Sequence, residues 1–396
     1  MRIAILSNSY PPHARGGSGQ IAKLQADWLS AQGNDVCVWV PAPFSAEPKN
    51  QQVKTFKPQT SIPFSALAKS NPLSRLVFHI EDIGPNAELV EDIRSFKPNV
   101  LLTHNLTGCG WGTADILRKT GIRWVHILHD VQMAEPSGQI LSQETFPKLR
   151  LLWRKYWSKK RSKAFGTPDV VVSPSGWLLS FHKQFNLFQN SQTVVIPNPL
   201  PAENSEPSTA GTNTPGSDSG LQRTILYVGR VSKDKGVDML IQAWKELKSL
   251  FESESSPFDL QLKIIGTGAY LNDIKNLNDP TILCMGALEH AELAKHYASA
   301  SLFVFPSLLM ENQPTVLLEA MSAGVNIVAS DVGGVGETLG GYGALVPPGN
   351  PSQLARGIYQ ELTKNPTRQI KAEILARHEI HQVMQNYQNL FNPPIT

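Results

Sequence analysis

The sequence predicts an α/β fold made of two doubly wound halves. Three observations predict it: short aliphatic runs recur along the chain, glycine-rich turns follow some of them, and apolar residues at helical spacing lie between them. Short, continuously apolar runs are typical of parallel strands covered on both faces. Strands that alternate with helices predict parallel sheets, with a ligand bound in the cleft between the halves, at the carboxyl ends of the strands.

The first half opens with a strand, a turn and a helix. The run from Ile3 to Leu6 predicts the strand, and Gly16, Gly17 and Gly19 break the chain after it. Apolar residues then recur at helical spacing from Ile21 to Leu29, and Gly33 is placed to end that helix. Further strands are predicted at residues 36–40, 100–103, 124–128, 170–173 and 193–196.

The composition changes abruptly between Pro201 and Gly220, where no apolar residue is larger than alanine. Such a stretch predicts a polar linker over 200–221, after an N-terminal domain at 1–199. Strand and helix patterning restarts with Thr224 and predicts a C-terminal domain over 222–375. Its strands are predicted to start at Thr224 and to lie at residues 262–265, 281–285, 302–305 and 326–329.

Charge and cysteine content exclude several classes of protein. The 396 residues carry 36 Lys and Arg against 33 Asp and Glu, and the net charge of +3 is too small to indicate a nucleic-acid binder. Cys37, Cys109 and Cys284 form no CxxC pair, so neither a disulfide framework nor a structural zinc site is expected, and we expect three small buried side chains in a reducing compartment. No apolar run approaches the ~20 residues of a membrane-spanning helix. We expect a cytoplasmic protein.

The segment 148–163 has an unusual composition. It holds eight basic residues, no acidic residue lies between Glu144 and Asp169, and its apolar and aromatic residues keep helical spacing. Such a helix can lie on an anionic membrane surface. The alternative, which the sequence leaves open, is an ordinary surface helix whose aromatic residues pack on its own domain.

Two features of the second half predict an anion site and a tight turn. Gly229 and Arg230 follow a strand, and Lys235 precedes a helix, so both cations lie where strand ends and helix N-termini attract phosphate groups. Gly266 and Gly268 form a GxG sequence after the next strand. Without a third glycine this is no dinucleotide fingerprint, and a tight turn is the better interpretation.

A third feature surrounds a helix start. The strand at 302–305 ends before Glu311, Pro314 suits the first turn of a helix, Glu319 lies one to two turns inside it, and Gly324 is placed to close it. The helix N-terminus favours a phosphate. Carboxylates on both sides of that point can accept hydrogen bonds from sugar hydroxyls, so the three features together predict a site for a sugar joined to a diphosphate.

These residues resemble those of family 4 glycosyltransferases with the GT-B fold. The resemblance rests on the order Gly-Arg, Lys-Gly, GxG and Glu-(x7)-Glu, and it extends over nearly the whole chain through these landmarks: Tyr10-Pro-Pro-His-Ala-Arg-Gly-Gly, His129-Asp130, Pro174-Ser175 and Ile196-Pro197-Asn198. The chain departs from the Gly-Phe-Gly of many members at Asn312, Gln313 and Pro314, and an Asn-x-Pro form also occurs in the family. The resemblance does not identify the sugar.

The resemblance implies a role for each matched residue. Arg230 and Lys235 would bind the diphosphate of a nucleotide-sugar donor, Glu311 and His129 would contact the transferred sugar, and Glu319 would bind the ribose. The remaining donor-binding residues that it implies are Gly16, Gly17, Gly229, Gly266, Gly268, Leu288, Asn312, Thr315 and Val316. His104 and Asn105, which follow another strand, are candidates for the acceptor side.

The negative charge that develops during the implied reaction indicates a mechanism. Breaking a sugar–phosphate bond builds negative charge on the diphosphate, which Arg, Lys and a helix N-terminus stabilise. The chain has no Asp pair at i, i+2, so no DxD metal site, no metal and no cofactor are expected. The resemblance implies retention of the anomeric configuration, and front-face attack by the acceptor is the favoured hypothesis. The expected acceptor is a lipid-linked saccharide or another envelope glycan at the inner face of the membrane, with the helix at 148–163 on the anionic surface.

The tail completes the prediction. Residues 370–390 have a helical pattern, and the fold implies that residues 376–396 return to the N-terminal domain. Three alternative functions remain open: a nucleotide-sugar epimerase or hydrolase on the same fold, a catalytically silent nucleotide-sugar-binding protein, and an NAD-dependent dehydrogenase. The dehydrogenase is disfavoured because no complete GxGxxG follows either opening strand.

Overall fold

A computed structural model describes residues 1–12, 17–42, 52–67, 69–200, 222–254, 258–363 and 372–392. The chain divides into two compact units. Unit 1 contains Met1–Gln139, Phe146–Pro199 and the residues from His381 onward, and unit 2 contains Ile140–Thr145 and Leu200–Ile380. The predicted linker lies outside the described residues from position 201 to position 221, as does Gly16.

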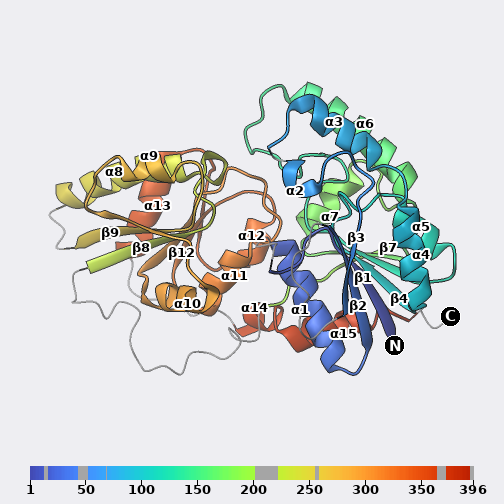
Figure 1. The fold of residues 1–396 in the computed structure, drawn as a ribbon. Coiled ribbons are helices and arrows are strands. Elements are labelled where there is room, and N and C mark those ends of the chain that lie inside the picture. Colours follow the sequence, from blue (N-terminus) through green and yellow to red (C-terminus); the bar gives the residue numbers. More distant parts are fainter. Residues whose placement is uncertain are drawn as a thin grey trace. The chain divides into compact units, whose positions relative to one another are not determined.

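Unit 1 is built on a parallel seven-stranded sheet with the order β3-β2-β1-β4-β5-β6-β7 (Figure 1). Helices cover it because its central strands are mainly apolar on both faces and, apart from Arg2, buried. The strands are β1 (Arg2–Leu6), β2 (Asp35–Pro41), β3 (Gln52–Phe56), β4 (Val100–Thr103), β5 (Arg123–Ile127), β6 (Val170–Ser173) and β7 (Gln192–Val195). The helices are α1 (Gly17–Ala31), α2 (Phe64–Leu67), α3 (Pro72–Glu81), α4 (Ala87–Phe96), α5 (Thr113–Arg118), α6 (Pro147–Phe165), α7 (Gly176–Lys183) and α15 (Ile380–Gln388).

Unit 2 repeats this architecture with a parallel six-stranded sheet of order β10-β9-β8-β11-β12-β13. Its strands are β8 (Gln222–Val228), β9 (Asp259–Ile265), β10 (Ile282–Gly286), β11 (Leu302–Phe305), β12 (Ile327–Ser330) and β13 (Ala344–Val346). Its helices are a 3-10 turn (Lys233–Lys235), α8 (Val237–Ser253), α9 (Leu271–Lys275), α10 (His290–Ser299), α11 (Thr315–Ser322), α12 (Val335–Leu339), α13 (Pro351–Thr363) and α14 (Ala372–Ala376). Two doubly wound α/β halves, as the sequence predicts, are therefore confirmed.

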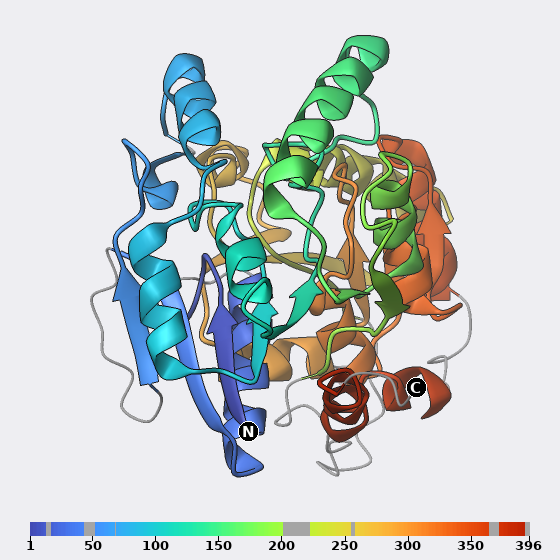
Figure 2. The same ribbon diagram turned by 90° about the vertical axis from the view of Figure 1, so that its right-hand side faces the viewer.

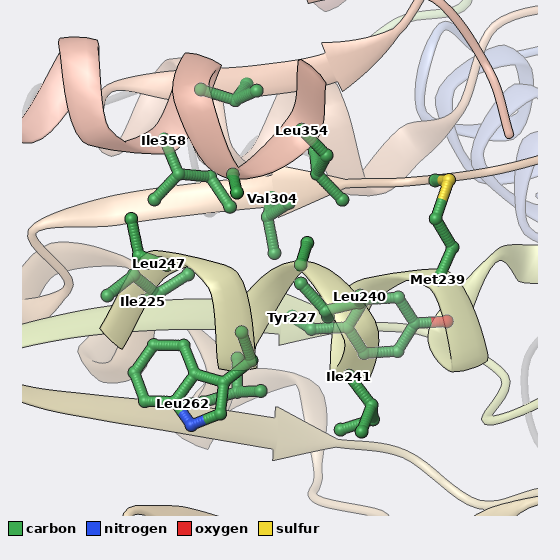
Figure 3. Close-up of a cluster of buried hydrophobic side chains, with 14 of the residues drawn as sticks. Ile225, Tyr227, Met239, Leu240, Ile241, Leu247, Leu262, Val304, Leu354 and Ile358 are labelled. Carbon is green, nitrogen blue, oxygen red and sulfur yellow. The ribbon is translucent and has the colours of Figure 1, made fainter. Parts of the chain in front are cut away.

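The core of unit 2 shows why the strand ends are well positioned. Leu240 and Leu247 of α8 and Leu354 of α13 pack with strand residues in one buried cluster, which Figure 3 shows together with Tyr227 of β8. Tyr227 is 2% exposed, and its hydroxyl donates a hydrogen bond of 2.7 Å to the carbonyl oxygen of Arg230. The core therefore fixes the backbone of the loop that follows β8.

Two strands at sheet edges were not predicted. β3 contains three polar and two apolar residues and pairs on one side only, with β2, so it lacks the continuous apolar run of a central strand. β13 has three residues, too few for a periodic signal.

The burial of one cysteine also differs from the prediction. Cys284 is only partly buried, whereas Cys37 and Cys109 are buried as expected.

The helical pattern predicted over 370–390 forms two helices, α14 and α15, with a break between Ala376 and Ile380, and its first two positions lie outside the described residues. The amide of His378 donates to the carbonyl of Leu375, and the carbonyl of His378 accepts from the amide of Leu200, so the backbone here bonds outside the helical pattern. After the break, α15 packs in unit 1, where Val383 and Met384 are fully buried.

Candidate active site

The loops that follow β8 and β11 bring a cation and a carboxylate together in unit 2. Lys235 Nζ lies 2.5 Å from Glu311 Oε1, and both side chains are mostly buried. Ser307 Oγ donates to the same carboxylate oxygen at 2.9 Å. Arg230 forms an ion pair with Asp234 in the same region. The predicted residues Arg230, Lys235 and Glu311 are thus found at the carboxyl ends of neighbouring strands, as a diphosphate site requires.

Backbone contacts hold Glu311 in place. Its carbonyl oxygen accepts from the amide of Gly334 at 2.8 Å, and a Cβ added to Gly333 would lie 2.0 Å from that oxygen. The amide of Leu308 donates to the carbonyl of Asp234 at 3.1 Å, which ties the Glu311 loop to the turn that carries Lys235. Only a residue without a side chain fits at position 333, so the loop geometry depends on this glycine.

A segment from the first half of the sequence also supports this loop. Ile140–Thr145 belongs to unit 2, and Leu141 forms an antiparallel bridge with Leu309. The amide of Met310 donates to Ile140, and the amide of Ser142 donates to Leu308, both at 2.7 Å. Sequence reasoning missed this segment because its pairing partner lies about 170 residues away and six residues are too few for a periodic signal.

Helix α11 starts next to Glu311. Pro314 is its N-cap, and Thr315 and Val316, whose amides were predicted to meet phosphates, are its first two residues. Asn312 and Leu288 are half-buried in unit 2. Further along α11, Glu319 Oε2 accepts a hydrogen bond of 3.0 Å from the hydroxyl of Tyr297, which is 2% exposed. Burial and the carboxylate raise the pKa of that phenol well above its usual value. Nothing in the sequence distinguishes Tyr297 from an ordinary core residue of α10.

The GxG sequence forms a tight turn against a neighbouring loop, in agreement with the interpretation preferred over a dinucleotide fingerprint. A Cβ on Gly266 would lie 1.8 Å from the carbonyl oxygen of Gly229, and one on Gly268 would lie 2.1 Å from that of Val231. The missing side chains let the loops after β8 and β9 approach each other.

Unit 1 carries a second cluster of predicted residues, on the loops after β4 and β5. His104 Nδ1 lies 2.8 Å from His129 Nε2, and the two rings stack with centroids 5.0 Å apart. Asn105 donates to Asp130 at 2.9 Å, and Thr107 donates to Gln132 at 2.5 Å. His104 and Asn105 therefore lie directly against His129 and Asp130. Gly17, also in unit 1, is the first residue of α1.

Burial sets the charge state of this second cluster. It lowers the pKa of His129 to about 4 and that of His104 well below its usual value, so both rings are neutral at pH 7. Burial raises the pKa of Asp130 to about 6, against the lowering effect of its hydrogen bonds from Gln132 and Asn105. Neutral imidazoles can donate to and accept from sugar hydroxyls without presenting a charge.

Two further observations concern metals and membranes. Among the residues that the structure describes, no three His, Cys, Asp or Glu side chains gather where they could hold a metal ion. Within the same residues, no helix is both long and apolar enough to cross a bilayer.

Two parallel sheets of Rossmann type and a cation–carboxylate cluster at the strand ends are features of enzymes that bind nucleotides and sugars. Two family profiles match the chain: "Glycosyltransferase Family 4" over residues 15–204 and "Glycosyl transferases group 1" over residues 222–364. The protein is a glycosyltransferase, and it belongs to the GT-B glycosyltransferases of the family 4 type.

Similarity to known proteins extends over most of the chain. The glycosyltransferase TuaC of Bacillus subtilis, named for teichuronic acid biosynthesis, is 24% identical over 90% of this chain and 88% of its own length. A 42.6 kDa protein of the cps region of Klebsiella pneumoniae is 21% identical over 85% of this chain and 87% of its own. The crystal structure of HepE from Anabaena in complex with UDP shares the fold with a TM-score of 0.66 at 17% identity, covering 98% of this chain and 99% of that one.

Proposed function

We propose that the protein is a retaining, metal-independent glycosyltransferase. It moves a sugar from a nucleotide-diphosphate-sugar donor to an envelope glycan or lipid-linked acceptor. The observation that carries the proposal is the cluster of Arg230, Lys235 and Glu311 at the ends of β8 and β11, beside the N-terminus of α11. The UDP complex of HepE and the name of TuaC support the donor class and the envelope role.

The charges of the cluster indicate how the donor binds. Each cation already has a carboxylate partner, Asp234 for Arg230 and Glu311 for Lys235. A diphosphate offers several anionic oxygens, so it can bind both cations and release their carboxylate partners. In this exchange the carboxylate of Glu311 becomes available to accept hydrogen bonds from the hydroxyls of the transferred sugar.

The remaining groups of the donor are bound by α11, by the neighbouring loops of unit 2 and by unit 1. The amides of Thr315 and Val316, at the positive end of the α11 dipole, bind phosphate oxygens, and Glu319 accepts from the ribose hydroxyls. The loops with Gly229, Gly266, Gly268 and Leu288 flank the base. Gly17 and His129 of unit 1 keep the roles that the family resemblance implies, phosphate contact and sugar contact.

Bond breaking places its charge on the phosphates. The bond between the anomeric carbon and the phosphate oxygen breaks, the acceptor oxygen bonds to the same face of that carbon, and the proton of the acceptor hydroxyl passes to the leaving diphosphate. Arg230, Lys235 and the α11 amides stabilise the diphosphate as its charge develops. No protein carboxylate needs to form a covalent intermediate.

The acceptor side of the proposal includes peripheral membrane association through α6. The aromatic residues of α6 are divided. Trp157 is fully buried in its own domain, whereas Trp153 and Tyr156 are exposed, as are Leu149 and Leu152 at 67% and 64%. A lipid-linked acceptor would be reached at such a surface.

Alanine at Lys235 tests the proposal. Loss of a cation that stabilises the leaving group lowers kcat by about 10²–10³. Lys233→Ala, in the same turn but exposed, is the matched control and retains activity near that of the wild type. The product anomer read by NMR tests retention, and activity after exhaustive chelation tests metal independence. If Lys235→Ala and Arg230→Ala transfer sugar as fast as Lys233→Ala does, the site assignment is wrong.

A further inference from the structure

Helix α3 turns its apolar stripe away from its own domain. Leu73, Leu76, Val77 and Ile80 follow the i, i+3, i+4, i+7 spacing of a helix face, and their exposed fractions run from 38% to 70%. Phe78 and His79, on the opposite side, are buried. An amphipathic helix of a globular protein ordinarily packs its apolar stripe on the core. In α3 the stripe lies on the outside.

Helix α6 also has an exposed apolar stripe. Its buried side carries Arg154, Trp157 and Arg161, while the stripe of Leu149, Leu152, Trp153 and Tyr156 is exposed. At 100° per residue this stripe lies on the side of the helix opposite the buried residues. Two helices of one unit therefore each turn an apolar stripe away from their buried side.

The two helices are joined at their C-terminal halves. His79 of α3 stacks edge-on with Trp157 of α6 at 5.9 Å, and Arg161 Nη2 lies 3.1 Å from His79 Nδ1. Both helices project from the same end of unit 1, α3 in blue and α6 in green in Figure 2. We call the two exposed stripes together the outer surface.

The charges around the outer surface indicate what covers it. Helix α6 contains no acidic residue, and six of its cations are exposed: Lys148, Arg150, Lys155, Lys159, Lys160 and Lys163. Lys160 Nζ lies 5.5 Å from the ring centre of Tyr156. Lysines beside exposed Trp, Tyr and Leu are typical of helices that lie in the headgroup region of an anionic bilayer. Helix α3 contributes one cation, Arg75, one carboxylate at its end, Glu81, and otherwise mainly apolar side chains.

We infer that α3 is the second half of a membrane-binding surface whose first half is α6, a conclusion that rests on the membrane part of the proposed function. The two halves differ in their physical contribution. Helix α6 attracts anionic headgroups and inserts aromatic residues, whereas α3 inserts aliphatic side chains with little charge. Binding through α3 is therefore insensitive to salt, and binding through the lysines of α6 weakens as salt rises.

Vesicle flotation of the full chain separates these contributions. The vesicles contain phosphatidylglycerol with phosphatidylcholine, or phosphatidylcholine alone, at low and at high salt. The α3 variant Leu73→Ser/Ile80→Ser removes two exposed aliphatic side chains without adding charge, and we expect at least tenfold weaker partitioning at both salts. The α6 variant Lys159→Gln/Lys160→Gln weakens binding to the anionic vesicles at low salt only. Leu277→Ser in unit 2, where Leu277 is 44% exposed, is the matched control and binds like the wild type.

The outcomes distinguish the inference from the proposal on which it rests. If the α3 variant floats like the wild type while the α6 variant does not, α3 is not part of the surface and the inference fails alone. If neither variant differs from the wild type, the membrane part of the proposed function fails too. A wild-type dimer that becomes monomeric in the α3 variant overturns the inference as well, because the stripe then binds a second copy. Donor hydrolysis, measured on every variant, stays at the wild-type rate.

Discussion

Glu319 and Tyr297 form a pair in which a core residue orients a residue proposed to bind the donor. The phenol is buried, its ring contacts Phe303 edge-on at 5.5 Å, and its hydroxyl donates to one carboxylate oxygen of Glu319. A carboxylate on a helix surface has several rotamers, and this hydrogen bond favours one of them. We therefore propose Tyr297 as a positioning residue for the proposed contact between Glu319 and the ribose.

We expect Tyr297→Phe to raise the donor KM by about fivefold with little change in kcat, because it removes one hydrogen bond worth about 1 kcal/mol. The effect disappears with a donor whose ribose lacks the 2′- and 3′-hydroxyls, which steady-state kinetics on both donors measures. Tyr342→Phe removes a comparable bond, from its hydroxyl to the carbonyl of Val325, and serves as the control. A KM increase that persists with the deoxy donor means that Tyr297 acts on the fold only.

At the scale of elements, the bounds of α6 can be predicted from the sequence, but the burial of its side chains cannot. Its boundaries, predicted as 148–163, agree closely with Pro147–Phe165. The sequence does not say which of its basic residues are buried, because Lys and Arg occur all round the helix. Arg154 pairs with Glu135 at 3.2 Å, and Arg161 is fully buried. The partner of Arg154 is a carboxylate from another loop, and Arg161 contacts the carbonyl of Gln132 and the ring of His79, so only the fold brings these groups together.

Arg161 joins α3, α6 and the loop after β5. It donates to the carbonyl of Gln132, three residues after His129, and it lies near His79. Burial lowers its pKa to about 10, and the nearby carboxylates of Asp82, Asp130 and Glu135 oppose that shift, so Arg161 stays charged at neutral pH. The arginine thus neutralises acids that are themselves buried.

Replacing Arg161 by methionine removes a buried cation that stabilises the ionised forms of Asp82 and Asp130, whereas Glu135 keeps its ion pair with Arg154. We expect unit 1 to lose about 3–5 kcal/mol of stability. Thermal or urea unfolding of the purified variant measures the loss. Arg150→Met, on the exposed side of the same helix, is the control and changes stability by less than about 0.5 kcal/mol. Equal stabilities of the two variants would contradict a structural role for Arg161.

At the scale of the whole molecule, the sequence predicts what is local and periodic. Both sheets, the helix start at Pro314 and the loops after β8 and β11 are predictable, because each depends on neighbouring residues. The pairing of Leu141 with Leu309 and the hydrogen bond from Tyr297 to Glu319 are not, since these contacts join residues distant in sequence. For the same reason the sequence does not predict that the apolar stripe of α3 is exposed, because the helix has an ordinary amphipathic pattern.

The two units differ in their response to acid. Burial lowers the pKa of five histidines of unit 1, to about 4 for His79, His129 and His182 and to about 3 for His126, with His104 well below its usual value. In unit 2, burial also lowers the pKa of His296, which lies nearer the surface. The unfolded chain therefore binds more protons than unit 1 does between about pH 6.5 and pH 4.

The sign of the pH effect follows from this difference. Where the unfolded state binds more protons, stability falls as the pH falls, so each buried histidine contributes stability that is present above pH 6.5 and is lost toward pH 4. Asp82 and Asp130 act in the opposite direction, because burial raises their pKa values to about 7 and about 6 and the folded state keeps protons that the unfolded chain releases. Two carboxyls oppose five imidazoles, each imidazole contributing about 1.4 kcal/mol per unit of pKa difference.

We therefore expect unit 1 to open before unit 2 as the pH falls from 6.5 to 4.5. Hydrogen exchange, corrected for intrinsic rates and assigned to peptides, measures this through amides of β4, β5 and β6 against those of β8 and β11. The variant His182→Gln removes a buried imidazole of α7 outside the proposed site and makes the loss of protection in unit 1 less steep. Loss of protection in both units at the same pH, or in unit 2 first, would show that the buried histidines do not govern the acid response.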